Sequence, residues 1–166
     1  MIILGIDPGF AIVGWGVVEY KASRFNLIDC GAILTKAGLD IEERLLIIYE
    51  ELSAIIDKYH PDEMAIEELF FNTNQKTAVN VAQARGTILL AARQKGVKIN
   101  EYTPLQVKQS VVGYGRAEKS QVIEMTRIIL KLDKKPKPDD TADALAIAIC
   151  HGHCSISRMQ KYFNQR

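Results

Sequence analysis

The sequence predicts an α/β domain built on a mixed sheet of five strands with helices on both faces. Three runs rich in Ile and Val follow one another with short turns between them, which predicts antiparallel strands at Ile2–Asp7, Gly14–Tyr20 and Phe25–Thr35. Helical and strand-like segments alternate after them, as in α/β proteins. The chain has 166 residues, close to the commonest domain size. We therefore expect a single domain over residues 1–166, and leave open whether 155–166 is an ordered segment or a flexible tail.

The later elements are bounded by residues that begin or end helices. Asp40 stands where a helix cap is expected, and apolar residues keep helical spacing from there until Pro61. Thr103, Pro104 and Gln106 have the order of a capping box with proline at the first helical position, so a helix begins there. The other predicted elements are strands at Glu63–Glu68 and Val97–Tyr102 and helices at Thr73–Lys95, Ala117–Leu132 and from Asp139–Asp140 onward.

The composition restricts the class of protein. Hydrophobic residues make up 48% of the chain, enough for a core, yet no stretch approaches the roughly 20 apolar residues of a membrane span. The N-terminus has no basic leader, and the three cysteines form no disulfide framework, so we expect a cytoplasmic protein. The net charge is only +1, although basic residues concentrate between Lys108 and Lys137. That concentration fits either a solvated helix face or a nucleic-acid surface.

Four acids could share one site. Asp7 ends the first strand, Glu67 lies near the end of the fourth, and Asp140 and Asp143 open the last helix on one face. Carboxylates gathered this closely repel one another unless a cation binds. Hard cations such as Mg²⁺ prefer oxygen ligands, and two ions about 3.5–4 Å apart can support phosphodiester hydrolysis. The pattern therefore favours metal-dependent phosphoryl-transfer chemistry on nucleic acid.

Each acid also has an ordinary structural explanation. Asp7 stands before Pro8-Gly9, where a carboxylate favours a turn. Asp140 lies where a helix N-terminus welcomes negative charge, and Glu67 alternates with Glu68 across a strand, so that one of the two faces solvent. Asp143 is the hardest to explain in this way, because it lies past the cap and an apolar run follows it.

Five blocks in order resemble the RuvC family of Holliday-junction resolvases. They are GIDPG, AIEELFF, QARG, QVKQSVVGYGRAEKSQV and DDTADALAIAICH, and they extend from Ile3 to about His153. The resemblance implies a ribonuclease-H-like fold, whose order of three antiparallel strands followed by α-β alternation agrees with the predicted elements. It also implies a homodimer that makes Mg²⁺-dependent nicks in two opposed strands of a four-way DNA junction.

The resemblance assigns roles to particular residues. The acidic tetrad of the family falls on Asp7, Glu67, Asp140 and Asp143, which would act as catalytic residues and metal ligands. The position of Asp140 varies within the family, with histidine in some members. The candidate DNA-binding residues are Lys108, Lys119, Phe70, Phe71, Arg116, Lys76 and Arg85. Phe70 or Phe71 would stack on an unpaired base, and the segment Asn72–Lys76 would form a loop that reaches the crossover point.

The implied reaction uses two Mg²⁺ ions in each active site, with Mn²⁺ as the expected substitute, and leaves 5′-phosphate and 3′-hydroxyl ends. The two-fold axis of a homodimer would match the pseudo-two-fold axis of the junction. A branch-migration motor complex is an expected partner, and no membrane contact is expected.

Two motifs and two rival functions offer alternatives to a junction-cleaving enzyme. Gly113–Ser120 resembles a phosphate-binding loop, but Glu118 occupies the position that requires glycine. The spacing of Cys150–Cys154 fits no zinc finger, and we expect His151 and His153 to be helix-end residues. An actin-like ATPase would share the three-strand opening but needs a second domain. A junction-binding protein without activity is the third possibility, against which the intact acids argue.

Overall fold

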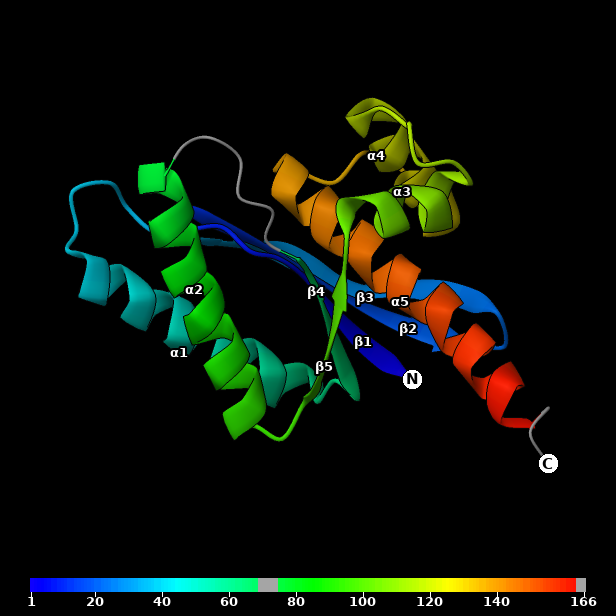
Figure 1. The fold of residues 1–166 in the computed structure, drawn as a ribbon, viewed down its shortest axis with the longest axis horizontal. Coiled ribbons are helices and arrows are strands. Elements are labelled where there is room, and N and C mark those ends of the chain that lie inside the picture. Colours follow the sequence, from blue (N-terminus) through cyan, green and yellow to red (C-terminus); the bar gives the residue numbers. More distant parts are fainter. Residues whose placement is uncertain (69–74, 164–166) are drawn as a thin grey trace.

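The computed structural model describes residues 1–68 and 75–163, and the side chains of 1–68 and 78–155. Its centre is a five-stranded sheet in the order β3-β2-β1-β4-β5 (Figure 1). The strands are β1 (Ile2–Asp7), β2 (Ile12–Lys21), β3 (Arg24–Leu34), β4 (Glu63–Glu67) and β5 (Lys98–Tyr102). β1 pairs antiparallel with β2, which pairs antiparallel with β3, whereas β4 is parallel to both β1 and β5. The predicted mixed sheet is confirmed.

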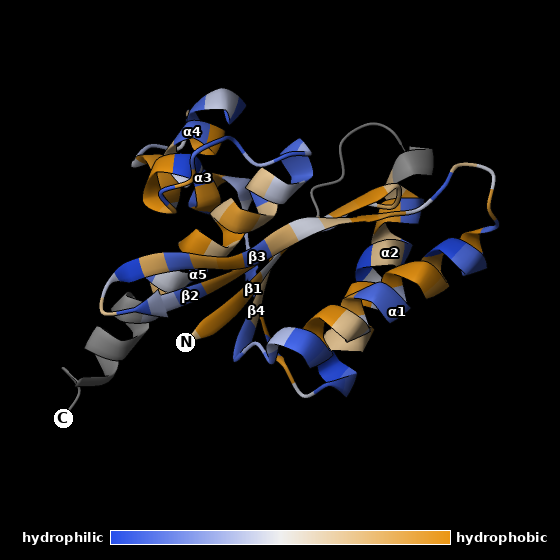
Figure 2. Cartoon of the chain, turned by 180° about the vertical axis from the view of Figure 1, so that it is seen from behind, coloured by the Kyte–Doolittle hydropathy of each residue, from blue (hydrophilic) through white to orange (hydrophobic). Residues whose placement is uncertain are grey.

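Helices cover both faces of this sheet (Figure 1). α1 (Ile41–Tyr59) and α2 (Gln75–Gln94) pack on one face, and α3 (Pro104–Val112), α4 (Lys119–Ile129) and α5 (Asp139–Phe163) lie over the other. Alternation along β1 divides the core between the two layers, because Leu4 and Ile6 join the cluster under α1 and α2 while Ile3 joins the cluster under α5. In Figure 2, β1 is largely hydrophobic, whereas α1 carries both hydrophilic and hydrophobic residues.

Several boundaries differ from the prediction by a few residues. β2 begins at Ile12, because this residue already pairs with Leu34 of β3. α4 begins at Lys119 because the preceding Glu118 is extended, with φ −75° and ψ 156°, and its N–H is held by Gln121 Oε1 at 2.8 Å. The capping box at Thr103 is confirmed, with Thr103 Oγ1 accepting from the Gln106 N–H at 3.1 Å.

The expectation for the two histidines is wrong. α5 continues to Phe163, so His151 and His153 lie inside the helix and not at its end. The side chains of residues 156–166, including Arg158, Lys161 and Arg166, lie outside the described residues, so their part in DNA binding stays open.

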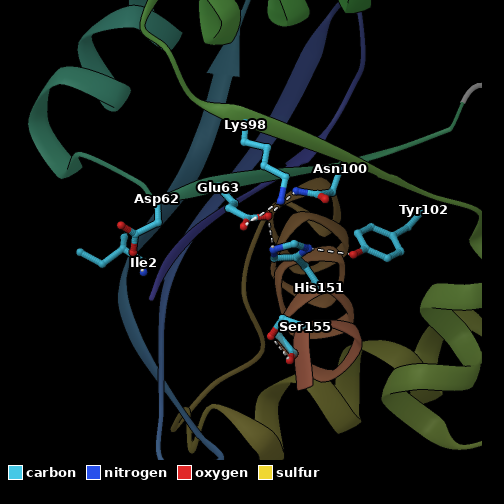
Figure 3. A network of polar contacts seen from close by, with 9 residues as sticks. Ile2, Asp62, Glu63, Lys98, Asn100, Tyr102, His151 and Ser155 are labelled. Carbon is cyan, nitrogen blue, oxygen red and sulfur yellow. Dashed lines mark hydrogen bonds and ion pairs between the residues drawn. The ribbon is translucent and has the colours of Figure 1, made fainter. Parts of the chain in front are cut away.

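A partly buried set of polar contacts fastens α5 to the two parallel strands β4 and β5 (Figure 3). His151 is 1% exposed, and its Nδ1 lies 2.7 Å from the Tyr102 hydroxyl while its Nε2 lies 3.2 Å from Glu63 Oε2. Asn100 Nδ2 donates to the same Glu63 oxygen at 2.7 Å, and Lys98 Nζ donates to Oε1 at 3.2 Å. These contacts fix the middle of α5, and therefore the direction in which its N-terminus points.

Within the described residues, no helix has the length and apolar character to cross a bilayer.

Candidate active site

Asp7 and Glu67 end neighbouring parallel strands. Ile6 of β1 pairs in register with Ile66 of β4, so the two acids are the next residues on adjacent strands. Because side chains alternate along a strand, Asp7 lies on the same face as Ile3, and Glu67 on the same face as Ala65. Both acids therefore belong to the α5 face of the sheet.

Glycines in the sheet bring the start of α5 against this edge. A Cβ atom at Gly14 would lie 2.0 Å from the Asp140 carbonyl oxygen, and one at Gly5 would lie 2.1 Å from the Ala144 carbonyl oxygen. The helix backbone thus occupies the space that side chains would fill on β1 and β2. Gly14 itself pairs with Asp7, so the helix end that carries Asp140 lies beside the end of β1. The contact could not be predicted from the sequence, because glycine inside a strand marks a close backbone approach without indicating which element approaches.

The acids are coupled electrostatically. Burial has the largest effect on Asp7, followed by the negative charges of Asp143, Glu67 and Asp140. Together they raise its pKa to about 7, against the opposing effect of Lys119. Burial and the charge of Asp143 likewise raise the pKa of Glu67. Burial also raises the pKa of Asp143, which Lys119 partly offsets. The structure therefore places the four predicted acids in one cluster.

Two lysines border the cluster. Lys119 Nζ lies 2.8 Å from Asp143 Oδ2, and the hydrogen bond to Asp143 raises the pKa of Lys119. Lys108, on α3, is close enough to Glu67 for its positive charge to offset part of the rise in the pKa of that carboxyl. A pocket of about 230 Å³ has Glu67, Lys108, Lys119 and Asp143 among its lining residues. Acids that could hold a cation and bases that could hold a phosphate thus face the same space.

Known proteins similar to this chain identify its family. Residues 3–151 match the family model of crossover junction endodeoxyribonuclease RuvC. The chain belongs to the RuvC family. A RuvC of this description from Ruminiclostridium cellulolyticum is 60% identical over 153 residues, 92% of each chain. One from Clostridioides difficile is 59% identical over 92% of this chain and 90% of its own.

Solved RuvC structures have the same architecture. RuvC of Thermus thermophilus matches with a TM-score of 0.87 at 35% identity, over 95% of this chain and 97% of its own. The same protein in complex with a Holliday junction substrate matches with a TM-score of 0.89 at 36% identity, over 93% and 94% of the two chains. The predicted ribonuclease-H-like fold is confirmed, and this chain is a crossover junction endodeoxyribonuclease.

The acids of this RuvC chain have the donor chemistry that a hard divalent cation prefers, since every candidate ligand is a carboxylate oxygen. Among the described residues, however, no group of three or more His, Cys, Asp or Glu side chains is arranged to hold a metal ion. The two observations differ because carboxylates couple electrostatically over longer distances than ligation requires, and because Lys119 contacts Asp143 directly. The chemistry of the donor set therefore fits the ion, although the carboxylates are not arranged as its ligands in the described residues of this structure.

The other predicted DNA contacts of this RuvC chain are spread more widely. Arg116 is exposed in the turn between α3 and α4, near Lys119 in the chain. Arg85 is not brought to the acids, because its side chain is 15% exposed and its Nη2 donates to Glu101 Oε2 on β5 at 2.6 Å. Phe70, Phe71 and the side chain of Lys76 lie outside the described residues, although the backbone of Lys76 belongs to α2.

Proposed function

We propose that this RuvC chain resolves four-way DNA junctions by metal-dependent hydrolysis, with paired nicks in two opposed strands that leave 5′-phosphate and 3′-hydroxyl ends. The observation that carries the proposal is the cluster itself, in which the charges of Asp143, Glu67 and Asp140 raise the pKa of Asp7 beside two lysines. Family membership and a relative solved with a Holliday junction substrate support the choice of DNA.

The acids have two tasks in this proposal. Asp7, Glu67, Asp140 and Asp143 would hold two Mg²⁺ ions, or Mn²⁺ in their place. When bound, such ions acidify the attacking water and stabilise the leaving oxygen. Asp7 must first lose its proton, because a protonated carboxyl is a poor ligand and burial together with the neighbouring acids raises its pKa to about 7. The rigid end of β1 then keeps this carboxylate in place opposite Glu67.

The lysines have a different task. Lys108 and Lys119 would neutralise backbone phosphates and orient the strand over the acids, so that binding weakens as salt increases.

A homodimer with two-fold symmetry would present two such sites to two equivalent strands of the junction. A branch-migration motor would act as a further partner.

A synthetic four-way junction tests the proposal. The purified protein is mixed with labelled junction in Mg²⁺, in Mn²⁺ or in chelator, and the products are separated on a denaturing gel. We expect symmetric nicks with either metal and a shifted but intact junction in chelator. Cleavage in chelator would contradict the metal-dependent mechanism, and binding without nicks in either metal would indicate a binding protein.

A further inference from the structure

A second pocket lies on the other side of the β1–β2 turn from the lysines. Its volume is about 630 Å³, and its lining includes Gly9, Phe10, Arg44, Asn80 and Asp140. The first pocket contains Glu67 and Asp143. The acids therefore stand between two hollows, one bordered by Lys108 and Lys119 and the other by Arg44.

The Arg44 side chain is fixed before any ligand arrives. Its Nε donates to Thr35 Oγ1 at 2.9 Å, and its Nη2 donates to the Phe10 carbonyl at 3.3 Å. Its guanidinium carbon lies 3.7 Å from the centroid of the Phe10 ring. Thr35 is fixed in turn, because its hydroxyl donates to the Phe10 carbonyl at 2.6 Å. Within the described part of the chain, Arg44 Nη1 donates to no acceptor, so part of the fork is available to an anion.

A DNA strand that passes over the acids needs positive charge on both sides of the scissile phosphate, because the acids repel the flanking phosphates. Lys108 and Lys119 supply that charge on one side. We infer that the pocket around Arg44 binds the backbone phosphate that flanks the scissile phosphate on the opposite side. A guanidinium held in a fixed orientation suits a phosphate, since its donors match the phosphate oxygens. Asn80 adds an amide at the same hollow. This inference rests on the proposed function and names Arg44 as a substrate-positioning residue.

A purely structural role for Arg44 makes a different prediction. Its bond to the Phe10 carbonyl ties α1 to the β1–β2 turn, and Asp7 precedes that turn. If Arg44 served only to hold this turn, removal of its charge would lower stability and slow cleavage. It would not change how much the neutralisation of one particular DNA phosphate weakens binding.

Neutral phosphates in the junction distinguish the two roles. The scissile phosphate is first located with the wild-type protein in Mg²⁺, and junctions are then made with a methylphosphonate at the flanking position on either side. Binding is measured in chelator by fluorescence anisotropy for wild type, Arg44→Gln, Arg44→Lys and Lys119→Gln. The matched control is Arg24→Gln, which removes one exposed arginine at the far end of β2 and β3.

We expect Arg44→Gln to weaken binding of the normal junction about tenfold, which corresponds to one charge-assisted phosphate contact. The slope of log K against log salt should fall by about 0.9. A methylphosphonate on the Arg44 side should weaken junction binding by wild type but not by Arg44→Gln. A methylphosphonate on the opposite side should weaken binding by wild type but not by Lys119→Gln. Arg44→Lys should recover part of the affinity, and Arg24→Gln should behave as wild type at both positions.

Two results would overturn the inference. In the first, Arg44→Gln is folded, as its thermal transition shows, yet each methylphosphonate lowers its affinity for the junction as much as it lowers that of wild type. The other is a salt slope for Arg44→Gln equal to that of wild type. Both can occur while wild type nicks normally, whereas failure of the proposed function would appear as wild type that does not cut the junction in Mg²⁺.

Discussion

Lys119 Nζ lies 2.8 Å from Asp143 Oδ2, so an ammonium group from α4 contacts a carboxylate of the acidic cluster on α5. The Lys119 side chain is 58% exposed and that of Asp143 29% exposed, which makes the pair accessible to solvent and to DNA. A cation in the cluster would compete with Lys119 for Asp143, and a phosphate of the substrate would compete with Asp143 for Lys119. Lys119 can therefore turn from Asp143 to a phosphate when the acids are otherwise neutralised.

Replacement of Lys119 by alanine should weaken junction binding and flatten its salt dependence. One lost phosphate contact lowers the slope of log K against log salt by about 0.9. Anisotropy titrations between low and moderate salt measure this slope. Lys21→Ala is the control, because Lys21 is exposed at the β2–β3 turn, far along β2 from Gly14. Equal slopes for Lys119→Ala and wild type would remove Lys119 from the DNA contacts.

Asp7→Asn should stabilise the metal-free protein at high pH. The pKa of Asp7 is about 7 in the folded protein, above its ordinary value of 3.8, so the folded state binds the additional proton between these values. Stability of wild type therefore falls as pH rises from about 4 to 7, and the neutral asparagine escapes this loss. We expect a gain of roughly 1–3 kcal/mol at pH 8, after allowance for solvent screening, that shrinks toward pH 5.

Urea unfolding in chelator at pH 5 and pH 8 measures this difference, with the exposed Asp133→Asn as the control. Mg²⁺ should raise the stability of wild type at pH 8 more than that of Asp7→Asn. A variant that is less stable than wild type at pH 8 would show that Asp7 is not held in a repulsive cluster.

Gly14→Ala should displace the start of α5. The new Cβ atom would meet the Asp140 carbonyl at 2.0 Å, so the helix must move or the strand must bend. We expect a loss of roughly 2–4 kcal/mol in the free energy of unfolding, together with slower cleavage. Gly86→Ala is the matched control, because a Cβ atom at this helical position meets nothing within 4 Å. That variant should be about 0.5–1 kcal/mol more stable than wild type.

Glu63→Gln should weaken the attachment of α5 without abolishing cleavage. Partial burial alone would raise the pKa of Glu63, but hydrogen bonds from Asn100 and Lys98, together with His151, lower it below 4.5. Its contribution to stability is therefore present above about pH 4.5 and is lost as pH falls through the folded pKa. We expect Glu63→Gln to cost about 1–2 kcal/mol at pH 7 and less near pH 4. Denaturation curves at both pH values, with exposed Glu50→Gln as the control, measure this difference.

Local patterns in the sequence predicted the fold well, and they singled out four acids whose charges act on one another in the structure. Asp7 could be found because a strand, a turn and an acid are adjacent in the chain, and the capping box at Thr103 could be found because it spans four residues. The glycine contacts of α5 could not be found, because the sequence does not state which helix crosses β1 and β2. The Lys119–Asp143 pair and the Arg44 pocket were missed for the same reason, since each joins elements that are distant in the chain.

The central claim is that the acids around Asp7 carry out metal-dependent cleavage of a DNA junction. Single-turnover cleavage of a synthetic four-way junction in Mg²⁺, by wild type and by Asp7→Asn at protein concentrations that saturate binding, tests it most directly. We predict symmetric nicks by wild type and a rate at least about a hundredfold lower for Asp7→Asn, with junction affinity retained. Cleavage by Asp7→Asn at a rate close to that of wild type would contradict the claim.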